Sequence, residues 1–341
     1  MVNLSTLKIV SSFLLVTVTI AFSFPSAQPE KVNHLNWGFY GHKRINRMAV
    51  FTLPPELFGF YKEHIEYITE HAVDPDKRRY AVEGEAPRHY IDIDHYAKEG
   101  EDPFAIVPRF WKDAVSKFSE DTLQTYGIVP WYIEVMVNKL TRAFESKNVD
   151  LILKYSADLG HYVGDAHVPL HTTENYNGQL TNQKGIHGLW ESRLPELMAD
   201  NYDYFVGKAR YHKNINTFAW EAVQASHIAV DSVLKIEKEL TEELATDAKY
   251  SFETRGASTV RTYSRDFSTV YHERLNGMVE RRFRAAIIGV GSMWYTAWVN
   301  AGQPDLTELL HVRPSEELLR EQEQLDLDVK QGKAKGRICD H

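Results

Sequence analysis

Two pairs of imidazole and carboxylate side chains are spaced so that each pair can hold one metal ion. His161 and Asp165 are four residues apart, as are His187 and Glu191. Residues at i and i+4 of an α-helix share a face, with Cβ atoms about 5–6 Å apart. A third imidazole, His171, lies between the pairs. Imidazole nitrogens and carboxylate oxygens together suit zinc without a thiolate, so this segment predicts a zinc centre.

A proline separates the two pairs. Proline disfavours helical geometry in the residue before it. Pro169 therefore predicts that the helix carrying His161 ends near His167 and that a turn presents His171 to the site. His167 itself is six residues from His161, on another face, which indicates a structural or supporting role. One His-x-x-x-Asp pair alone is more often a pair of solvated side chains, but several such spacings together favour a metal centre.

Amphipathic helices must position these groups. Apolar residues recur at helical spacing in seven segments, near 37–53, 56–71, 107–118, 130–144, 148–167, 216–245 and 265–300. The helix over 148–167 should bury one apolar face and turn His161 and Asp165 toward the site. Asp158 on the same side either orients His161 or is solvated. Residues 85–96 predict a short strand or an extended loop, and 172–186 a loop. The fold expected is all-α, with one catalytic domain over 37–304.

The two ends of the chain are predicted to lie outside this domain. Residues 1–23 predict a signal peptide, with cleavage as late as residue 27, because the apolar run is shorter than the about 20 residues of a membrane span. An uncleaved membrane anchor is the alternative. Residues 24–36 predict a linker, and 305–341 a charged tail that is either solvated helix or disordered. The protein is therefore expected to be exported, either periplasmic or secreted.

The charge of the chain bears on its partners. It has 39 basic and 47 acidic residues among 341, a net charge of −8. No basic excess provides a footprint for duplex DNA, so duplex binding is not expected. Phosphate esters remain possible substrates if metal ions supply the positive charge. The single cysteine, Cys339, allows no disulfide within the chain.

The motifs resemble the superfamily of zinc-dependent bacterial phospholipase C and single-strand-specific nucleases. The likeness rests on WGFYGH from Trp37, on Asp74, on His89 in APRHYID, and on HYVGDAHVPLH followed by HGLWE. These elements span about residues 37–191, and the helical pattern extends the resemblance to about residue 300. The resemblance implies an all-helical domain with three zinc ions that hydrolyses phosphate esters.

The resemblance also implies a ligand set by matching position. One zinc ion would take Asp74, His89, His161 and Asp165, and Asp74 is also the candidate general base. The second ion would take His171, His187 and Glu191. The third would take His42 and the main chain of Trp37, with Asp165 bridging. In the family this tryptophan is the mature N-terminus, so either a second processing step exposes Trp37 here or the third site is altered.

Three functions follow as hypotheses. The first is a phospholipase C-like hydrolase, because Glu191 matches the phospholipase branch, where the last acid is glutamate. The second is the same chemistry on single-stranded nucleic acid or nucleotides. The third, from another class, is a zinc-stabilised exported binding protein without turnover. The expected partners are a phospholipid or a single strand, with possible transient contact with a membrane surface, and the protein is expected to be a monomer.

Overall fold

The computed structural model of the chain describes residues 39–245, 247–255 and 258–331. These residues fall in one compact unit, 33–341. The expected signal peptide, the linker and Trp37 lie outside the described residues. Within the described part, the only sheet is a two-stranded hairpin, and the other regular elements are helical. This confirms the predicted all-α class, with the hairpin as an addition.

The described helices and strands follow one another along the chain. Three 3-10 turns and one π-helical turn border the site: η3 (His71–Val73), η4 (Ala86–His89), η6 (Pro169–Thr172) and η7 (Leu189–Arg193). The α-helices and strands are α1 (Phe39–Ala49), α2 (Pro55–Glu63), α3 (Ile65–Glu70), α4 (Asp74–Ala81), α5 (Pro103–Ile106), α6 (Trp111–Phe118), α7 (Glu120–Tyr126), α8 (Val129–Glu145), α9 (Val149–Asp165), α10 (Ile186–Gly188), α11 (Leu194–Met198), α12 (Ile215–Glu243), β1 (Tyr250–Arg255), β2 (Ser258–Tyr263), α13 (Arg265–Arg274), α14 (Met278–Asn300) and α15 (Glu316–Lys330).

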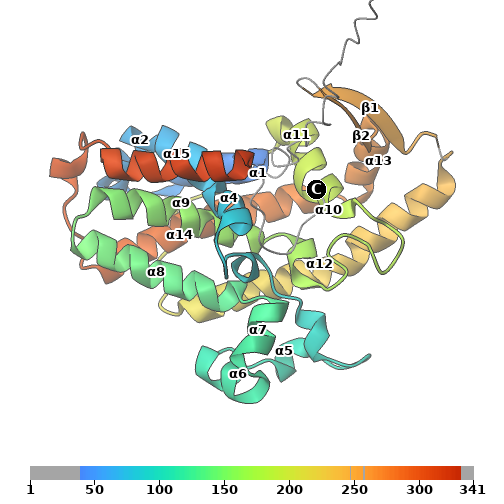
Figure 1. Ribbon diagram of the computed structural model, residues 1–341, viewed down its shortest axis with the longest axis horizontal. Helices are drawn as coiled ribbons and strands as arrows, with labels where there is room; N and C mark the ends of the chain where they lie inside the picture. Colours follow the sequence, from blue (N-terminus) through green and yellow to red (C-terminus); the bar gives the residue numbers. More distant parts are fainter. Residues whose placement is uncertain (1–38, 246, 256–257, 332–341) are drawn as a thin grey trace, which may run out of the picture. The chain divides into compact units, whose positions relative to one another are not determined.

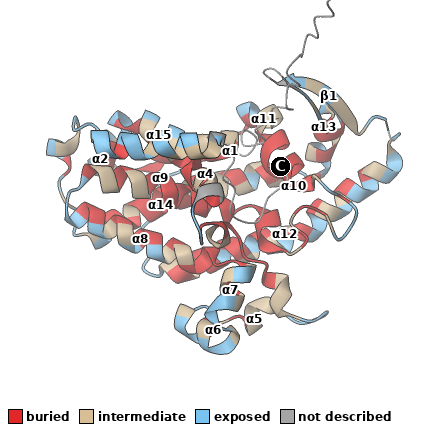
Figure 2. Ribbon diagram, viewed as in Figure 1, coloured by how far each residue is buried: buried red, intermediate tan, exposed pale blue. Residues whose placement is uncertain are grey.

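The core lies among α8, α9 and α14, which pack against one another, with α1 against α9 and α14 (Figure 1). Aromatic side chains fill it: Trp294, Tyr61 and Tyr162 are all fully buried. Tyr61 and Trp294 stack with ring centroids 4.7 Å apart. Burial is densest along α9 and α14 (Figure 2). The helix that carries His161 and Asp165 is thus held on several sides.

The helix α9 begins and ends where its sequence predicts. The Asn148 side chain accepts a hydrogen bond from the backbone N–H of Leu151, which satisfies one free donor of the first turn. The helix ends at Asp165, and Val168 adopts extended backbone angles before Pro169. The following turn, η6, carries His171, as predicted.

Two segments predicted as single helices are broken. The segment 56–71 breaks at His64, between α2 and α3. The segment 265–300 breaks at Asn276 and Gly277, whose φ angles are 48° and 71°, between α13 and α14. A left-handed pair cannot continue a right-handed helix. Apolar periodicity continues across both breaks, so periodicity alone did not reveal them.

Two further segments differ from expectation. Strands β1 and β2 pair antiparallel, with Tyr250 opposite Tyr263, and these strands were not predicted. Residues 85–96 form neither a strand nor a simple loop but two 3-10 turns, η4 and η5 (Ile93–Tyr96). The direction of the His89 side chain is therefore set by the turn η4 and not by the alternation of a strand.

The described part of the charged tail is ordered as α15, which packs on α4. Lys77 of α4 lies 2.9 Å from Asp326, and the Gln322 amide donates to the hydroxyl of Tyr67 at 2.5 Å. Leu318 is its buried anchor. Of the two expectations for this tail, helix is correct for 316–330. The longest helices, α12 and α14, have 29 and 23 residues, and no described helix is apolar enough to cross a membrane.

Candidate metal centre

Buried imidazole and carboxylate groups converge on one face of α9. His161 Nε2 lies 3.2 Å from Asp165 Oδ2, as the i, i+4 spacing predicts. Donor atoms gather within 4.8 Å of one another in four overlapping groups among the described residues. The groups are His42–Asp76–His161, His89–His161–Asp165, His171–His187–Glu191 and His42–Asp165–Glu191.

The turn η4 delivers His89 to the face of α9. His89 Nδ1 lies 3.0 Å from Asp165 Oδ2 and 3.0 Å from His161 Nε2. Its other nitrogen, Nε2, faces Glu85 Oε1 at 3.7 Å. Glu85 is fully buried and also accepts a hydrogen bond from the Tyr162 hydroxyl. Burial raises the pKa of Glu85, but His89 and Arg78 outweigh it and lower that pKa, so Glu85 is ionised beside the ring of His89.

A second group forms around Glu191 at the start of η7. His187 Nε2 lies 2.6 Å and His171 Nε2 3.3 Å from the same oxygen, Glu191 Oε2. Burial raises the pKa of Glu191, but His171 and His187 outweigh it and hold that pKa well below its usual range. The i, i+4 pairing of His187 with Glu191 is therefore present, across a short α-helical turn that continues as a π-helical one.

His42 on α1 joins the two groups. Its Nε2 lies 3.4 Å from Asp165 Oδ1 and 3.3 Å from Glu191 Oε1. Burial lowers the pKa of His42, but hydrogen bonds with both carboxylates outweigh it and raise the pKa to about 10. The ring also stacks on that of His161, with centroids 3.9 Å apart. The second residue expected at this position, Trp37, lies outside the described residues.

The placement of Asp74 corrects the sequence-based prediction. Its carboxylate lies 2.8 Å from His71 Nδ1 and 2.9 Å from Lys77 Nζ, and no described donor group includes it. Asp76 faces the site instead, with Oδ1 3.6 Å from His161 Nε2 and 3.7 Å from His89 Nδ1. Both residues lie on α4, and two positions along a helix turn a side chain by about 200°. Only one of the pair can face α9.

Two other polar side chains on α9 or just after it are structural. Asp158 pairs with Arg78, Oδ2 to Nη2 at 2.8 Å, and is buried, not solvated. His167 Nδ1 donates to the Val163 carbonyl at 2.7 Å. Burial, with Arg282 nearby, lowers the pKa of His167 to about 3, so the ring is neutral. The supporting role expected for His167 fits these contacts.

The proton arrangement of three histidines fits a bound cation. A carbonyl oxygen only accepts, so each Nδ1 that faces one carries the proton. His161 Nδ1 lies 2.9 Å from the Ala72 oxygen, His171 Nδ1 2.6 Å from that of His89, and His187 Nδ1 3.1 Å from that of Tyr176. In the neutral form of each ring, Nε2 then presents a lone pair to a carboxylate oxygen. Two acceptors in contact need a cation or an added proton between them, so the donor set suits zinc.

Sequence reasoning missed two residues of this centre. Asp76 is two residues after Asp74, and the resemblance to the family by matching position selected Asp74. Glu85 precedes His89 by four residues, a spacing that could have suggested a carboxylate partner for the ring. No local sequence motif identifies either residue, because the position of each side chain depends on how α4 and η4 pack on α9.

Comparison with known proteins shows a match to a protein family. The family model described as S1/P1 Nuclease matches residues 37–287, well over half of the chain. This span contains every residue of the four donor groups and ends within α14, before α15. No curated protein sequence matches the chain significantly.

Proposed function

Since the chain belongs to the S1/P1 nuclease family, which comprises zinc-dependent hydrolases of phosphoric ester bonds, we propose that it cleaves single-stranded nucleic acid with three zinc ions. The family match supports this nuclease reading better than phospholipase C-like hydrolysis, which the sequence analysis placed first. The identity of the last acid, Glu191, does not outweigh a match over 37–287.

The proposal of three ions rests on one observation about Asp165 and Glu191. In each of these carboxylates, the two oxygens contact histidines of different donor groups. Asp165 directs Oδ2 to His89 and His161 and Oδ1 to His42. Glu191 directs Oε2 to His171 and His187 and Oε1 to His42. A single cation would not need two such bridges, whereas adjoining cations are held together by them.

The ligand set proposed for each ion follows from these groups. Asp76, His89, His161 and Asp165 would hold the first, and Asp76 replaces Asp74 as ligand and candidate base. The second would be held by His171, His187 and Glu191. The third would be held by His42 between Asp165 and Glu191, with Trp37 as the further expected ligand. Bound zinc would lower the pKa of a coordinated water toward 7 and neutralise charge on phosphate oxygens.

The protein's own groups then orient the substrate and the ions. Arg79 is buried, lies 3.8 Å from Asp76, and lines a small cavity with His171, His187 and Tyr90. A guanidinium there is placed to bind a phosphate oxygen. The backbone carbonyls of Ala72, His89 and Tyr176 hold three imidazoles in the tautomer that binds metal.

The test compares substrates and metal content on one preparation. We expect about three zinc ions per chain by metal analysis and chelator-reversible hydrolysis of single-stranded DNA. Parallel assays use duplex DNA and phosphatidylcholine vesicles. Release of phosphocholine without cleavage of single-stranded DNA would support the phospholipase reading instead. Full zinc content with no hydrolysis of any phosphodiester would support the binding protein without turnover.

A further inference from the structure

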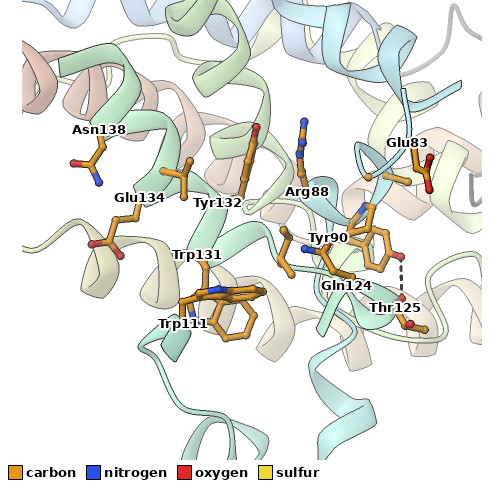
Figure 3. A pocket seen from close by; sticks show the side chains of 15 residues that line it. Glu83, Arg88, Tyr90, Trp111, Gln124, Thr125, Trp131, Tyr132, Glu134 and Asn138 are labelled. Atoms are coloured by element: carbon orange, nitrogen blue, oxygen red, sulfur yellow. Dashed lines mark hydrogen bonds between the residues drawn. The ribbon is translucent and has the colours of Figure 1, made fainter. Parts of the chain in front are cut away.

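A large cavity is lined in part by Arg88 and Tyr90 (Figure 3), which flank His89 along the chain. Its volume is about 1140 Å³, slightly above the about 300–1,000 Å³ of most ligand pockets. None of the proposed metal ligands lines it. Its walls come from η4, α6, α7 and α8, and we call it the Trp111 cavity, after a residue of its lining. The side chains that the argument uses are Arg88, Tyr90, Trp111, Gln124, Tyr132 and Asn138.

The Trp111 cavity and the metal centre share one wall. On the cavity side, the N–H groups of Ile128 and Val129 donate to the carbonyls of Pro87 and Tyr90, at 2.7 and 3.1 Å. On the other side, His171 Nδ1 donates to the carbonyl of His89. His89 thus faces the metal centre, while Tyr90 lines both the Trp111 cavity and the small cavity beside His171. Tyr90 is therefore the residue that the two spaces have in common.

The surfaces inside the cavity are flat and fixed. Trp111 and Trp131 meet edge to face, with centroids 5.5 Å apart at 69°. Trp131 Nε1 donates to the Arg109 carbonyl at 3.0 Å, which sets its ring. The Arg88 guanidinium lies 4.6 Å from the centroid of the Tyr132 ring, and Figure 3 shows these two side chains next to each other. Nucleic acid bases stack on such aromatic and guanidinium planes.

The charges of the lining favour a base over a phosphate. Glu83 and Glu134 are acidic, and the one arginine, Arg88, is paired with Glu85 at 2.5 Å. A phosphate would therefore meet no unpaired cation among these side chains. The amides of Gln124 and Asn138 both donate and accept, as the edge of a base requires.

We propose that the Trp111 cavity binds a base of the same single strand, next to the phosphodiester that the metal centre cleaves. The inference rests on the proposed nuclease function and extends it, because it makes the preferred substrate a strand of several nucleotides. Trp111 and Tyr132 supply the stacking surfaces, since both are partly exposed whereas Trp131 is buried.

The test compares Trp111→Ala and Tyr132→Leu with a matched control, Phe110→Ala. Phe110 is adjacent to Trp111, 65% exposed, and outside the cavity lining. For each variant, kcat/KM is measured on octathymidylate and on bis(4-nitrophenyl) phosphate, which has no base. Stacking of one base corresponds to about a fivefold or larger effect. We expect the ratio of the two kcat/KM values to fall about fivefold or more in the cavity variants and to stay constant in the control.

A binding measurement separates the two proposals. Fluorescein-labelled octathymidylate is titrated with zinc-loaded protein, and circular dichroism confirms that each variant is folded. Weaker binding by both cavity variants supports the cavity even if the wild-type protein cleaves no DNA, in which case only the nuclease proposal fails. Equal binding and an equal kcat/KM ratio in Trp111→Ala and Phe110→Ala overturn the cavity proposal. Weaker binding of short-chain phosphatidylcholine, with octathymidylate unaffected, overturns it in favour of an acyl-chain site.

Discussion

Asp165 and Glu191 connect the metal centre at the scale of single residues. Each carboxylate is buried, and each contacts histidines from more than one element. Loss of either would remove a ligand from two groups at once. Asp76, His89, His171 and His187 each belong to one group only, so their substitution separates the proposed ions.

Asp76→Asn and Asp74→Asn form a matched pair that tests the corrected ligand. An amide is a poor zinc ligand, so Asp76→Asn should lose zinc and reduce hydrolysis by about 100-fold or more, beyond the 10–100-fold typical of supporting groups. Asp74→Asn should keep its zinc, because its carboxylate contacts His71 and Lys77 instead. Metal analysis and kcat/KM measure both. Zinc lost from Asp74→Asn but kept by Asp76→Asn would restore the original assignment.

Gly164→Ala tests the position of His42. A methyl group there would lie 3.0 Å from Nδ1 and 3.2 Å from Cε1 of the His42 ring, so the ring must shift by a few tenths of an ångström. We expect zinc stoichiometry to fall by about one ion and activity by roughly tenfold, within the range found for displaced supporting groups. Gly41→Ala is the control, because its methyl group would make ordinary contacts at 3.7 and 3.8 Å. Equal zinc content in both variants would contradict a His42 ion.

Helices α4 and α15 connect the site to the rest of the fold at the scale of elements. Helix α4 carries Asp76 and Arg79, and α15 covers its outer side through Asp326 and Lys77. Helix α15 lies beyond the span that matches the family. A segment outside the family match therefore supports a residue of the proposed centre.

Deletion of residues 315–341 should destabilise the protein. Burial of Leu318 alone corresponds to about 1.5–3 kcal/mol. The partly exposed pair Lys77–Asp326 adds at most about 1 kcal/mol. We expect the free energy of unfolding in urea to fall by about 2 kcal/mol or more and zinc affinity to weaken. Asp326→Asn should lower the free energy of unfolding by less than about 1 kcal/mol. Glu316→Gln should leave that free energy unchanged, because Glu316 and its partner Arg320 are both exposed. A deletion variant as stable as the full chain would exclude a structural role for α15.

The metal centre acts as part of the core at the scale of the whole molecule. Three carboxylates and several imidazoles meet in a largely buried region, at whose edge Asp76 is partly exposed. Without cations, lone pairs and negative charges would face one another at hydrogen-bond distance. Metal binding and folding should therefore be coupled.

Chelation should lower the thermal stability of the whole described unit. A ligand at about 100 times its Kd contributes about 2.7 kcal/mol per site, which corresponds to a Tm shift of roughly 5–10 °C. Differential scanning calorimetry with and without EDTA measures the change, and re-addition of zinc should reverse it. Magnesium in place of zinc serves as the control, because it prefers oxygen ligands. An unchanged Tm after verified zinc removal would separate the metals from the fold.

The sequence by itself determined the helices and the types of ligand. Periodic apolar residues predicted α8, α9 and α12, and Pro169 predicted the end of α9. Both predictions succeeded because helical spacing and the effect of proline depend only on residues close together in the sequence. The i, i+4 pairs His161–Asp165 and His187–Glu191 needed only helical geometry. The left-handed break at Asn276 and Gly277 was not predicted, because apolar spacing continues through it. Strands β1 and β2 were not predicted either, because a short alternating pattern is weak evidence for a strand.

Only the tertiary structure decided which aspartate faces the histidines and what lies behind His89. The rotation of α4 about its axis decides whether Asp74 or Asp76 faces the histidines. This rotation depends on how α4 packs against α9 and α15. His89 meets His161 across 72 residues because η4 is held between His171 and the start of α8. The same packing leaves the Trp111 cavity on the other side of that wall. Contacts between distant segments depend on how whole elements pack together, and the spacing of residues along the sequence does not predict that packing.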